Sequence, residues 1–465
     1  MAHPPNVREA QPPHVREAQP SHAREAQPPV RGTAWSEGVD RLRAGATTEP
    51  GRLRIIGALA AVLVVAFGAV TAWEVSGRAS AADDVVSRSQ PLSADAASVY
   101  RSLADADTAA SSGFLEGAQE PQDVLTRYNK DIATASELLV KAAANTDSSS
   151  ASGHEIATLN KELPRYTGLI ERARANNRQG LPLGGAYLRY ANDRMTKTLL
   201  PAAERLYQSE TRRLGDDYDE ARVWPFAGLG LGVVALGGLV LVQQRNYRRT
   251  NRVFNHGLLA ASVASAVVLL WLGVGHAVSR AELNDARTHG QVSLEVLNDA
   301  RINSLKARAN ENLTLVARGA VLAKDGKRDL YESQYADSMK VLGERLGDAG
   351  KFADDLAGSE PVKVATKSVG VWRERHTTAR ATDDSGDYES ARLQITGDKK
   401  STDECFDAVD AALDKALAHE QAEFTRAAED GLGALTGLPL GAALLAVLGA
   451  TGAVLGIGRR LSEYR

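Results

Sequence analysis

Four long apolar stretches divide the chain, and long polar segments separate them. None of the four contains Asp, Glu, Lys or Arg, and each approaches or exceeds the ~20 residues that a helix needs to cross the hydrocarbon core of a bilayer. The stretches are Ile55–Trp73, Trp224–Val242, Gly257–Val278 and Leu435–Ile457. The pattern predicts an all-α membrane protein with four transmembrane helices, in which two large polar domains, 74–223 and 279–434, alternate with the spans.

Both large domains carry apolar residues at helical spacing. Three narrow seams repeat every three or four residues, which is typical of long, coiled-coil-like helices packed in a bundle. The seams are Leu188, Ala191, Met195, Leu199, Ala202 and Leu206; Ile302, Leu305, Ala309, Leu313, Val316 and Ala320; and Phe406, Val409, Leu413, Leu417 and Phe424. We therefore expect helical domains with little strand.

Glycine, proline and polar clusters interrupt the helical pattern at regular intervals. The predicted breaks are Gly117–Pro121, Thr146–Gly153 and Asn176–Gly185 in the first domain, and Asp325–Lys327, Gly358–Pro361, Thr382–Gly386 and Thr396–Thr402 in the second. Each domain then has about four helical segments, of which the outer two run into the spans. The expected architecture is a four-helix-bundle-like domain standing on each pair of membrane helices.

The two halves of the chain look like a tandem duplication. Each half has the order span, long helix, shorter helices, long helix, span. Four residues of the first domain align with four of the second at one constant offset: Tyr128, Ile132, Glu137 and Leu139 with Tyr335, Met339, Glu344 and Leu346.

Basic residues at the span ends predict the orientation in the membrane. The turn 243–256 contains Arg245, Arg248, Arg249 and Arg252, and the C-terminal stub 458–465 contains Arg459 and Arg460. We expect a multi-pass cell-membrane protein with both termini and this turn in the cytoplasm, and with both large domains extracytoplasmic. These six arginines are also the candidate contacts for a cytosolic partner, although setting the orientation and touching anionic lipid is the simpler role for each.

A cleaved signal peptide is the alternative interpretation of the first span, with Ala79-Ser80-Ala81 as its small-residue site. The apolar run is longer than the ~7–15 residues of a signal peptide, and a long tail precedes it, so a membrane span is favoured.

That tail, residues 1–54, contains an eight-residue repeat, seen at Val7–Pro12, Val15–Pro20 and Ala23–Pro28. Its prolines and its low apolar content predict disorder.

Composition and motifs favour no enzyme class. The net charge of −3 gives no reason to expect nucleic-acid binding, and the single cysteine, Cys405, cannot form an internal disulfide. The nine histidines are scattered, so we expect no metal site, no cofactor and no catalytic group. Two glycine pairs inside spans predict close helix packing: Gly228 with Gly232, and Gly452 with Gly456.

Three segments resemble actinobacterial four-span membrane proteins of the GlnX type. They are Gly180–Arg189, Leu199–Ala203 and Ala307–Gly319. The resemblance covers about residues 50 to 465, mostly as layout. It implies a protein that connects an extracytoplasmic amino-acid-binding lipoprotein with the cytosolic serine/threonine protein kinase G, and it carries over no binding residues.

Two classes of function follow from this layout. The first is a non-enzymatic transmembrane sensor or relay, which passes a signal from an outer binding protein or a small solute such as an amino acid to a cytosolic partner such as a serine/threonine kinase. The second is a structural envelope protein whose bundles scaffold other membrane proteins.

Overall fold

The computed structural model describes residues 49–117, 119–250, 255–397 and 399–462, and within them the chain is helical, with a single isolated bridge between Leu322 and Asp329. The repeat tail and Arg252 lie outside the described residues. The first half contains α2 (Glu49–Asp84), the π-helix η1 (Val85–Ser89), α3 (Gln90–Leu115), α4 (Gln122–Asn145), α5 (Ala151–Arg178), α6 (Leu183–Arg194), the π-helix η2 (Met195–Leu199), α7 (Leu200–Ala221) and α8 (Phe226–Thr250).

The second half follows a similar order. It contains α9 (His256–Asp285), the π-helix η3 (Ala286–Gln291), α10 (Val292–Ala317), α11 (Leu330–Phe352), α12 (Leu356–Asp384), α13 (Tyr388–Thr396), α14 (Thr402–Gly433) and α15 (Leu438–Ser462). In both halves the first helix passes through a π-helical turn into the helix that follows it.

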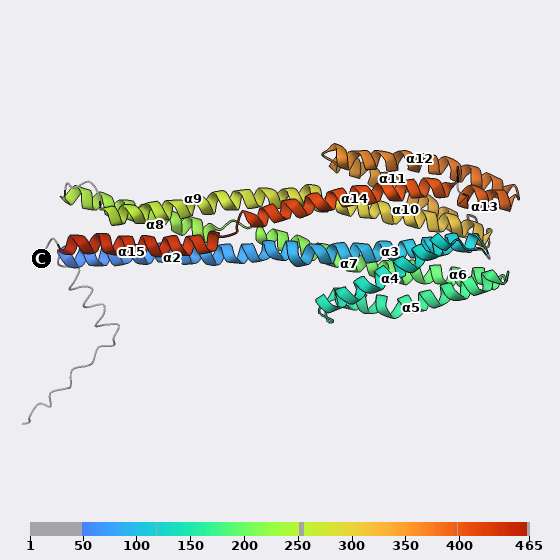
Figure 1. Cartoon of the computed structure of the whole chain (residues 1–465), viewed down its shortest axis with the longest axis horizontal. Helices are drawn as coiled ribbons and strands as arrows, with labels where there is room; N and C mark the ends of the chain where they lie inside the picture. The colour runs from blue at the N-terminus through green and yellow to red at the C-terminus, as the bar shows by residue number, and fades with distance from the viewer. Residues whose placement is uncertain (1–48, 118, 251–254, 398, 463–465) are drawn as a thin grey trace, which may run out of the picture.

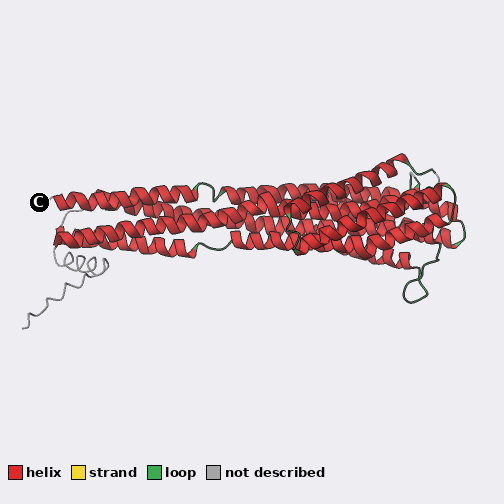
Figure 2. Cartoon of the chain, turned by 90° about the horizontal axis from the view of Figure 1, so that it is seen from below, coloured by secondary structure: helices red, strands yellow, loops and turns green. Residues whose placement is uncertain are grey.

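The molecule is elongated, with its four most apolar helices at one end (Figures 1 and 2). There α2 packs on α15 and α8, and α9 packs on α15 and α8. Four helical runs, 51–115, 183–248, 256–317 and 402–459, contain segments long and apolar enough to cross a membrane. Large apolar side chains point outward in these segments: Leu59, Leu241, Leu270 and Leu448 are 64%, 66%, 67% and 65% exposed. Such a surface fits a lipid environment better than water.

The other end holds the remaining helices of both halves around one shared core. α3 and α10 lie side by side at its centre (Figure 1). α4 packs on α3, and α5 packs on α6 and α7; in the second half α11 packs on α10, and α12 packs on α14 and α13. One apolar cluster runs through both halves, from Tyr100 and Leu139 to Leu342 and Leu413. The seams in the sequence did not reveal this contact between the halves.

The residues of the three predicted seams are buried, except that Val316 is half-buried and Ala320 is exposed. Leu199, Leu313 and Val409 each have no exposed surface, whereas Ala320 is exposed. The seam prediction is wrong at Ala320 because α10 ends at Ala317, and the next two residues adopt left-handed backbone conformations, with φ of 49° at Arg318 and 71° at Gly319. A helix cannot continue through that geometry.

Two of the four outer helices do not run directly into the spans, contrary to expectation. Residues 222–225 separate α7 from α8, and residues 434–437 separate α14 from α15. Pro225 lacks an N–H for a continuing helix, and Gly437 has a φ of 80°. The other two runs, α2–η1–α3 and α9–η3–α10, are unbroken.

One predicted loop is displaced. The break expected at Gly358–Pro361 lies at residues 353–355, and α12 continues through Pro361. The reason is an N-cap: the Asp355 carboxylate accepts a hydrogen bond of 2.7 Å from the Gly358 N–H, which starts the helix earlier.

Candidate ligand site between the two halves

A cavity of about 320 Å³ lies where four long helices meet, immediately beyond the two π-helical turns η1 and η3. This volume is at the lower end of the range for small-molecule sites. Its wall is built by α3, α7, α10 and α14, with one residue of η3. The polar side chains of the wall are Gln90, Ser93, Ser98, Arg101, Tyr207, Thr211, Gln291, Asn298, Arg301, Asp414 and Gln421.

Arg101 on α3 is the most informative residue of the wall. Its guanidinium is largely buried and donates hydrogen bonds to the Asn298 side-chain oxygen and, over 2.7 Å, to the Ser98 hydroxyl. Both acceptors are neutral, and among the described residues no carboxylate lies within salt-bridge distance of it. Burial, together with the nearby Arg301 charge, lowers the pKa of Arg101 to about 10. A cation in this setting is incompletely compensated, and an anionic group in the cavity would stabilise it.

Arg301 on α10 lines the same cavity but is fully paired. Its Nε and Nη2 donate to the two Asp410 oxygens over 2.8 and 3.1 Å, and its Nη1 donates to Asp414 over 2.7 Å. Arg101 and Arg301 carry the same charge, but among the described residues only Arg301 is paired with carboxylates. The site therefore has one satisfied cation on α10 and one on α3 that still has capacity for an anion.

The rest of the wall offers neutral hydrogen-bonding groups. The Ser93 and Thr211 hydroxyls lie 3.0 Å apart, and the Gln291 side-chain oxygen is buried without a hydrogen-bond partner among the described residues. A buried carbonyl oxygen of this kind is costly unless a donor reaches it. The donors and acceptors on the wall thus suit a solute that is polar as well as anionic.

The π-helical turns position the two glutamines of the wall. Gln90 follows η1 directly, and Gln291 is the last residue of η3. A π-turn inserts one extra residue per turn and so shifts the helix face that follows, a feature frequent at functional sites. Sequence periodicity gave no signal for these turns, because the residues on either side keep an ordinary helical pattern.

A second polar cluster, which the sequence analysis missed, lies inside the second half. The fully buried Glu311 carboxylate accepts hydrogen bonds from Arg308 (2.8 Å), the Trp372 indole (3.2 Å) and Thr402 (3.0 Å), and it pairs with His376 Nδ1 (2.9 Å). The members of this cluster lie on three helices that are far apart in the sequence, so helical spacing within one segment does not show that they meet. It ties α10, α12 and α14 together, and we assign it to stability.

His376 also faces Glu332 on α11, with Nε2 3.1 Å from the carboxylate, and stacks on the Tyr335 ring at 3.7 Å. Burial by itself would lower the pKa of His376, but the hydrogen bonds to Glu311 and Glu332 outweigh it and raise the pKa to about 9. His376 is therefore a cation at neutral pH, held between two carboxylates.

The arginines selected from the sequence lie away from this site, at the far end of the apolar helices. Arg245 and Arg248 are exposed near the end of α8, and Arg459 is exposed near the end of α15. Arg249 and Arg460 belong to the last turns of the same two helices. These helix ends lie at the left of Figure 1, so the ends of α8 and α15 that carry the five described arginines are at one pole of the molecule.

The four glycines selected from the spans lie at close helix contacts. A Cβ at Gly232 would lie 2.7 Å from both Phe67 and Leu269, and one at Gly456 would lie 2.9 Å from the Gly257 Cα. A Cβ at Gly452 would lie 3.1 Å from the Gly257 carbonyl oxygen. The Gly228 N–H donates to the Glu74 carboxylate over 2.6 Å.

Arginines from both halves donate hydrogen bonds to the backbone at the break between α7 and α8. Arg78 of α2 donates to the carbonyl oxygens of Val223 (2.6 Å) and Trp224 (3.0 Å), and Arg280 of α9 donates to the Arg222 carbonyl over 3.1 Å. These bonds satisfy carbonyl groups that the end of a helix leaves without partners. The break is thus a defined joint between the span and the bundle.

The fold and the site describe a multi-helix protein with membrane-type helices at one pole and, beyond η1 and η3, a cavity with polar side chains in its wall. Residues 81–219 match the model of a family described as the actinobacterial sensor domain. The match supports an actinobacterial sensor-type protein and a sensor role. No curated protein and no solved structure matches the chain. The matched segment runs from the end of α2 through most of α7, and it includes Arg101, Tyr207 and Thr211 of the cavity wall.

Proposed function

We propose that the protein is a non-enzymatic transmembrane sensor that binds a small carboxylate-bearing solute in the cavity between its halves and relays the binding to the cytoplasmic pole. The observation that carries the proposal is the position of the cavity. It lies between the helices that lead to the membrane, next to the π-helical turns through which two of them are continuous with the spans. The sensor-domain match over residues 81–219 supports this role.

The solute is expected to carry a carboxylate. The group would pair with Arg101, whose present acceptors are neutral, and a donor on the solute would reach the Gln291 oxygen. Asp414 at the Arg301 side of the cavity adds a carboxylate that suits an ammonium group. Amino acids combine these features, and the resemblance to GlnX-type proteins points to the same class of solute.

The relay would follow the unbroken helices. α3 and α10 hold the cavity wall on one side of η1 and η3, and α2 and α9 continue as helices on the other side. A change in the α3–α10 spacing would therefore tilt the spans. α7 and α14 would follow through their joints at residues 222–225 and 434–437.

The orientation belongs to the proposal. The arginine-rich turn, the C-terminal stub and the N-terminal tail would face the cytoplasm, and both helical domains would be extracytoplasmic. The similar order of elements in the two halves supports the tandem duplication. A binding lipoprotein outside and a serine/threonine kinase inside are the partners that the resemblance implies, with Arg245–Arg252 and Arg459–Arg460 as contact candidates.

The first experiment measures solute binding. Full-length protein in nanodiscs is screened by thermal shift against carboxylate-bearing solutes, including amino acids, and hits are titrated by calorimetry. Arg101→Gln should weaken binding of a hit at least tenfold, because it removes the charge that the solute neutralises. Arg213→Gln, an exposed arginine of α7 outside the cavity wall, is the matched control. Equal affinity of the Arg101 variant and the wild type would refute the site.

The second experiment measures the relay. Replacing Arg248 and Arg249 by Gln leaves other basic residues to maintain the orientation. The variant should insert normally and lose co-purification with its cytosolic partner or lose the response to solute. Unchanged partner binding and response would leave these arginines as determinants of orientation.

The alternative function is a structural envelope scaffold without a signalling role. The exposed, long helical surfaces of the outer end are its supporting observation. Pull-down from membranes separates the two classes: a scaffold would capture envelope proteins irrespective of solute, whereas a sensor would capture its partner in a solute-dependent way.

A further inference from the structure

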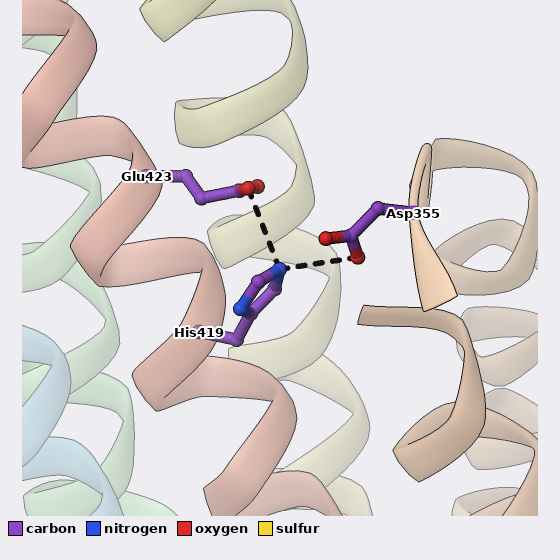
Figure 3. A group of neighbouring side chains, drawn as sticks. All are labelled: Asp355, His419 and Glu423. Carbon is purple, nitrogen blue, oxygen red and sulfur yellow. Dashed lines mark ion pairs between the residues drawn. The ribbon is translucent and has the colours of Figure 1, made fainter. Parts of the chain in front are cut away.

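A cluster of metal-ligating side chains lies on the opposite side of α14 from the residues that line the cavity. His419 and Glu423 are four residues apart on α14, and Asp355 caps the N-terminus of α12 (Figure 3). The His419 Nε2 atom lies 3.2 Å from an Asp355 oxygen and 3.5 Å from a Glu423 oxygen. Figure 3 shows both carboxylates turned toward this one nitrogen.

These distances match the edges of a metal coordination polyhedron. Ligands at ~2.0–2.2 Å from a first-row divalent ion lie about 3.0–3.5 Å apart in octahedral or tetrahedral geometry. A small movement would place the three atoms around one ion, with water completing the shell. One imidazole with two carboxylates is a mixed nitrogen and oxygen set, which suits Zn²⁺ or Mn²⁺ better than Ca²⁺.

One further observation points to a ligand, and a second describes how the helices come together. The Nε2 atom is buried and makes no well-oriented hydrogen bond with the described residues, although two carboxylates approach it. A glycine also shapes the floor of the cluster: a Cβ at Gly358 would lie 3.1 Å from a Glu420 oxygen and 3.5 Å from the His419 ring. The glycine lets α12 approach α14 closely enough for ligands from both helices to converge.

We infer that Asp355, His419 and Glu423 form a binding site for a divalent first-row transition metal that joins the start of α12 to α14. Asp355 is pre-positioned because its Oδ1 accepts the Gly358 N–H over 2.7 Å. The sequence gave no indication of the site, because only His419 and Glu423 are close in the chain. The site stands apart from the solute cavity, so its test is independent of the proposed function.

The test measures metal binding by the full-length protein after treatment with a chelator. Zn²⁺ and Mn²⁺ are titrated by calorimetry, bound metal is counted by elemental analysis after desalting, and Co²⁺ serves as a spectroscopic probe. We expect one ion per chain above the background, and a Co²⁺ absorption band that reports nitrogen and oxygen ligands. His419→Ala should remove this ion, and it leaves the histidines of the N-terminal tail unchanged, so it also measures their background.

Two variants keep the test sharp. Glu423→Gln keeps the size of the side chain and should weaken binding by at least tenfold even where His419→Ala disturbs folding. His289→Ala is the matched control: His289 also pairs with a carboxylate four residues away, Asp285 at 2.8 Å, but belongs to no three-ligand group among the described residues. It should bind as the wild type does. Equal metal content in the wild type and the two site variants would overturn the inference, as would loss of the ion in His289→Ala.

Discussion

The buried His376 makes a quantitative prediction about pH and stability. In the unfolded chain its pKa is ordinary, 6.5, and in the folded protein the pKa is about 9. Below pH 6.5 His376 is protonated in both the folded and the unfolded state, so its pairing with Glu311 and Glu332 contributes fully to the stability. Between pH 6.5 and 9 only the folded state holds it, and stability falls as the pH rises until the contribution is lost above pH 9.

The size of the effect follows from the shift in pKa. Each pKa unit is worth ~1.4 kcal/mol, so the shift of His376 corresponds to about 3 kcal/mol. At roughly 2 °C per kcal/mol for a helical region of this size, the melting temperature should be about 6 °C lower at pH 9 than at pH 6 through this residue alone. The groups that hold the proton are Glu311 of α10 and Glu332 of α11.

The assay is thermal unfolding of the purified protein from pH 6 to 9. Asp131 and Glu420 have pKa values raised to about 8 and about 7, mainly by burial, and they add a slope of the same sign. The contribution of His376 to the pH dependence of the melting temperature is therefore the difference in that dependence between the wild type and His376→Gln, whose side chain cannot titrate. The variant should be less stable at pH 6 and should lose about 6 °C of the pH dependence.

The control for this experiment is His289→Gln, which replaces a half-exposed histidine on the helix surface. It should keep the pH dependence of the wild type. The reasoning is refuted if His376→Gln retains the full slope between pH 6.5 and 9, because the proton would then not be held by the Glu311 and Glu332 carboxylates.

Three further predictions concern packing and orientation. Gly232→Leu should lower the melting temperature or prevent assembly of the spans, whereas Gly230→Leu on the same helix should be tolerated, since a Cβ at Gly230 meets nothing within 4 Å; thermal unfolding compares them. Leu313→Asp should abolish cooperative unfolding and reduce helix in circular dichroism, because Leu313 has no exposed surface and an unpaired buried charge costs several kcal/mol. A cysteine introduced at Ser149 should react with an impermeant reagent from outside the cell, and Cys405, which is buried, should do so only after unfolding; labelling of either from the cytosolic side alone would contradict the orientation.

Local patterns predicted much of the fold. The absence of charge from four stretches identified the apolar helices, and the three- and four-residue spacing identified buried residues such as Leu199 and Val409. Both signals can be read within one segment of the chain. Residues three or four positions apart share a face of a helix, so their spacing alone predicts which of them are buried together. The same signal failed at Ala320, where the left-handed backbone of Arg318 and Gly319 ends the helix before the apolar pattern does.

The candidate sites could not be found in this way, because they depend on contacts between distant segments. Arg101 is informative only once Asn298 and Ser98 are known to be its acceptors. His419 is informative only because α12 begins at its side with Asp355. Helical periodicity places residues on faces of a helix but does not say which faces meet. It therefore could not predict the contact between the halves or the cavity that this contact forms.

The proposed relay would need only a small movement at the cavity, because two of the long helices are unbroken. From Gln90 back to Gly51 the chain rises by roughly 60 Å at 1.5 Å per residue. A tilt of about 1–2° at η1 would then move the far end of α2 by about 1–2 Å, which is the size of helix shift seen in many allosteric transitions. α9 would move in the same way from η3. In the proposed relay, a solute that drew α3 and α10 together through Arg101 would need to change the bundle only slightly, because the length of the helices would amplify the movement.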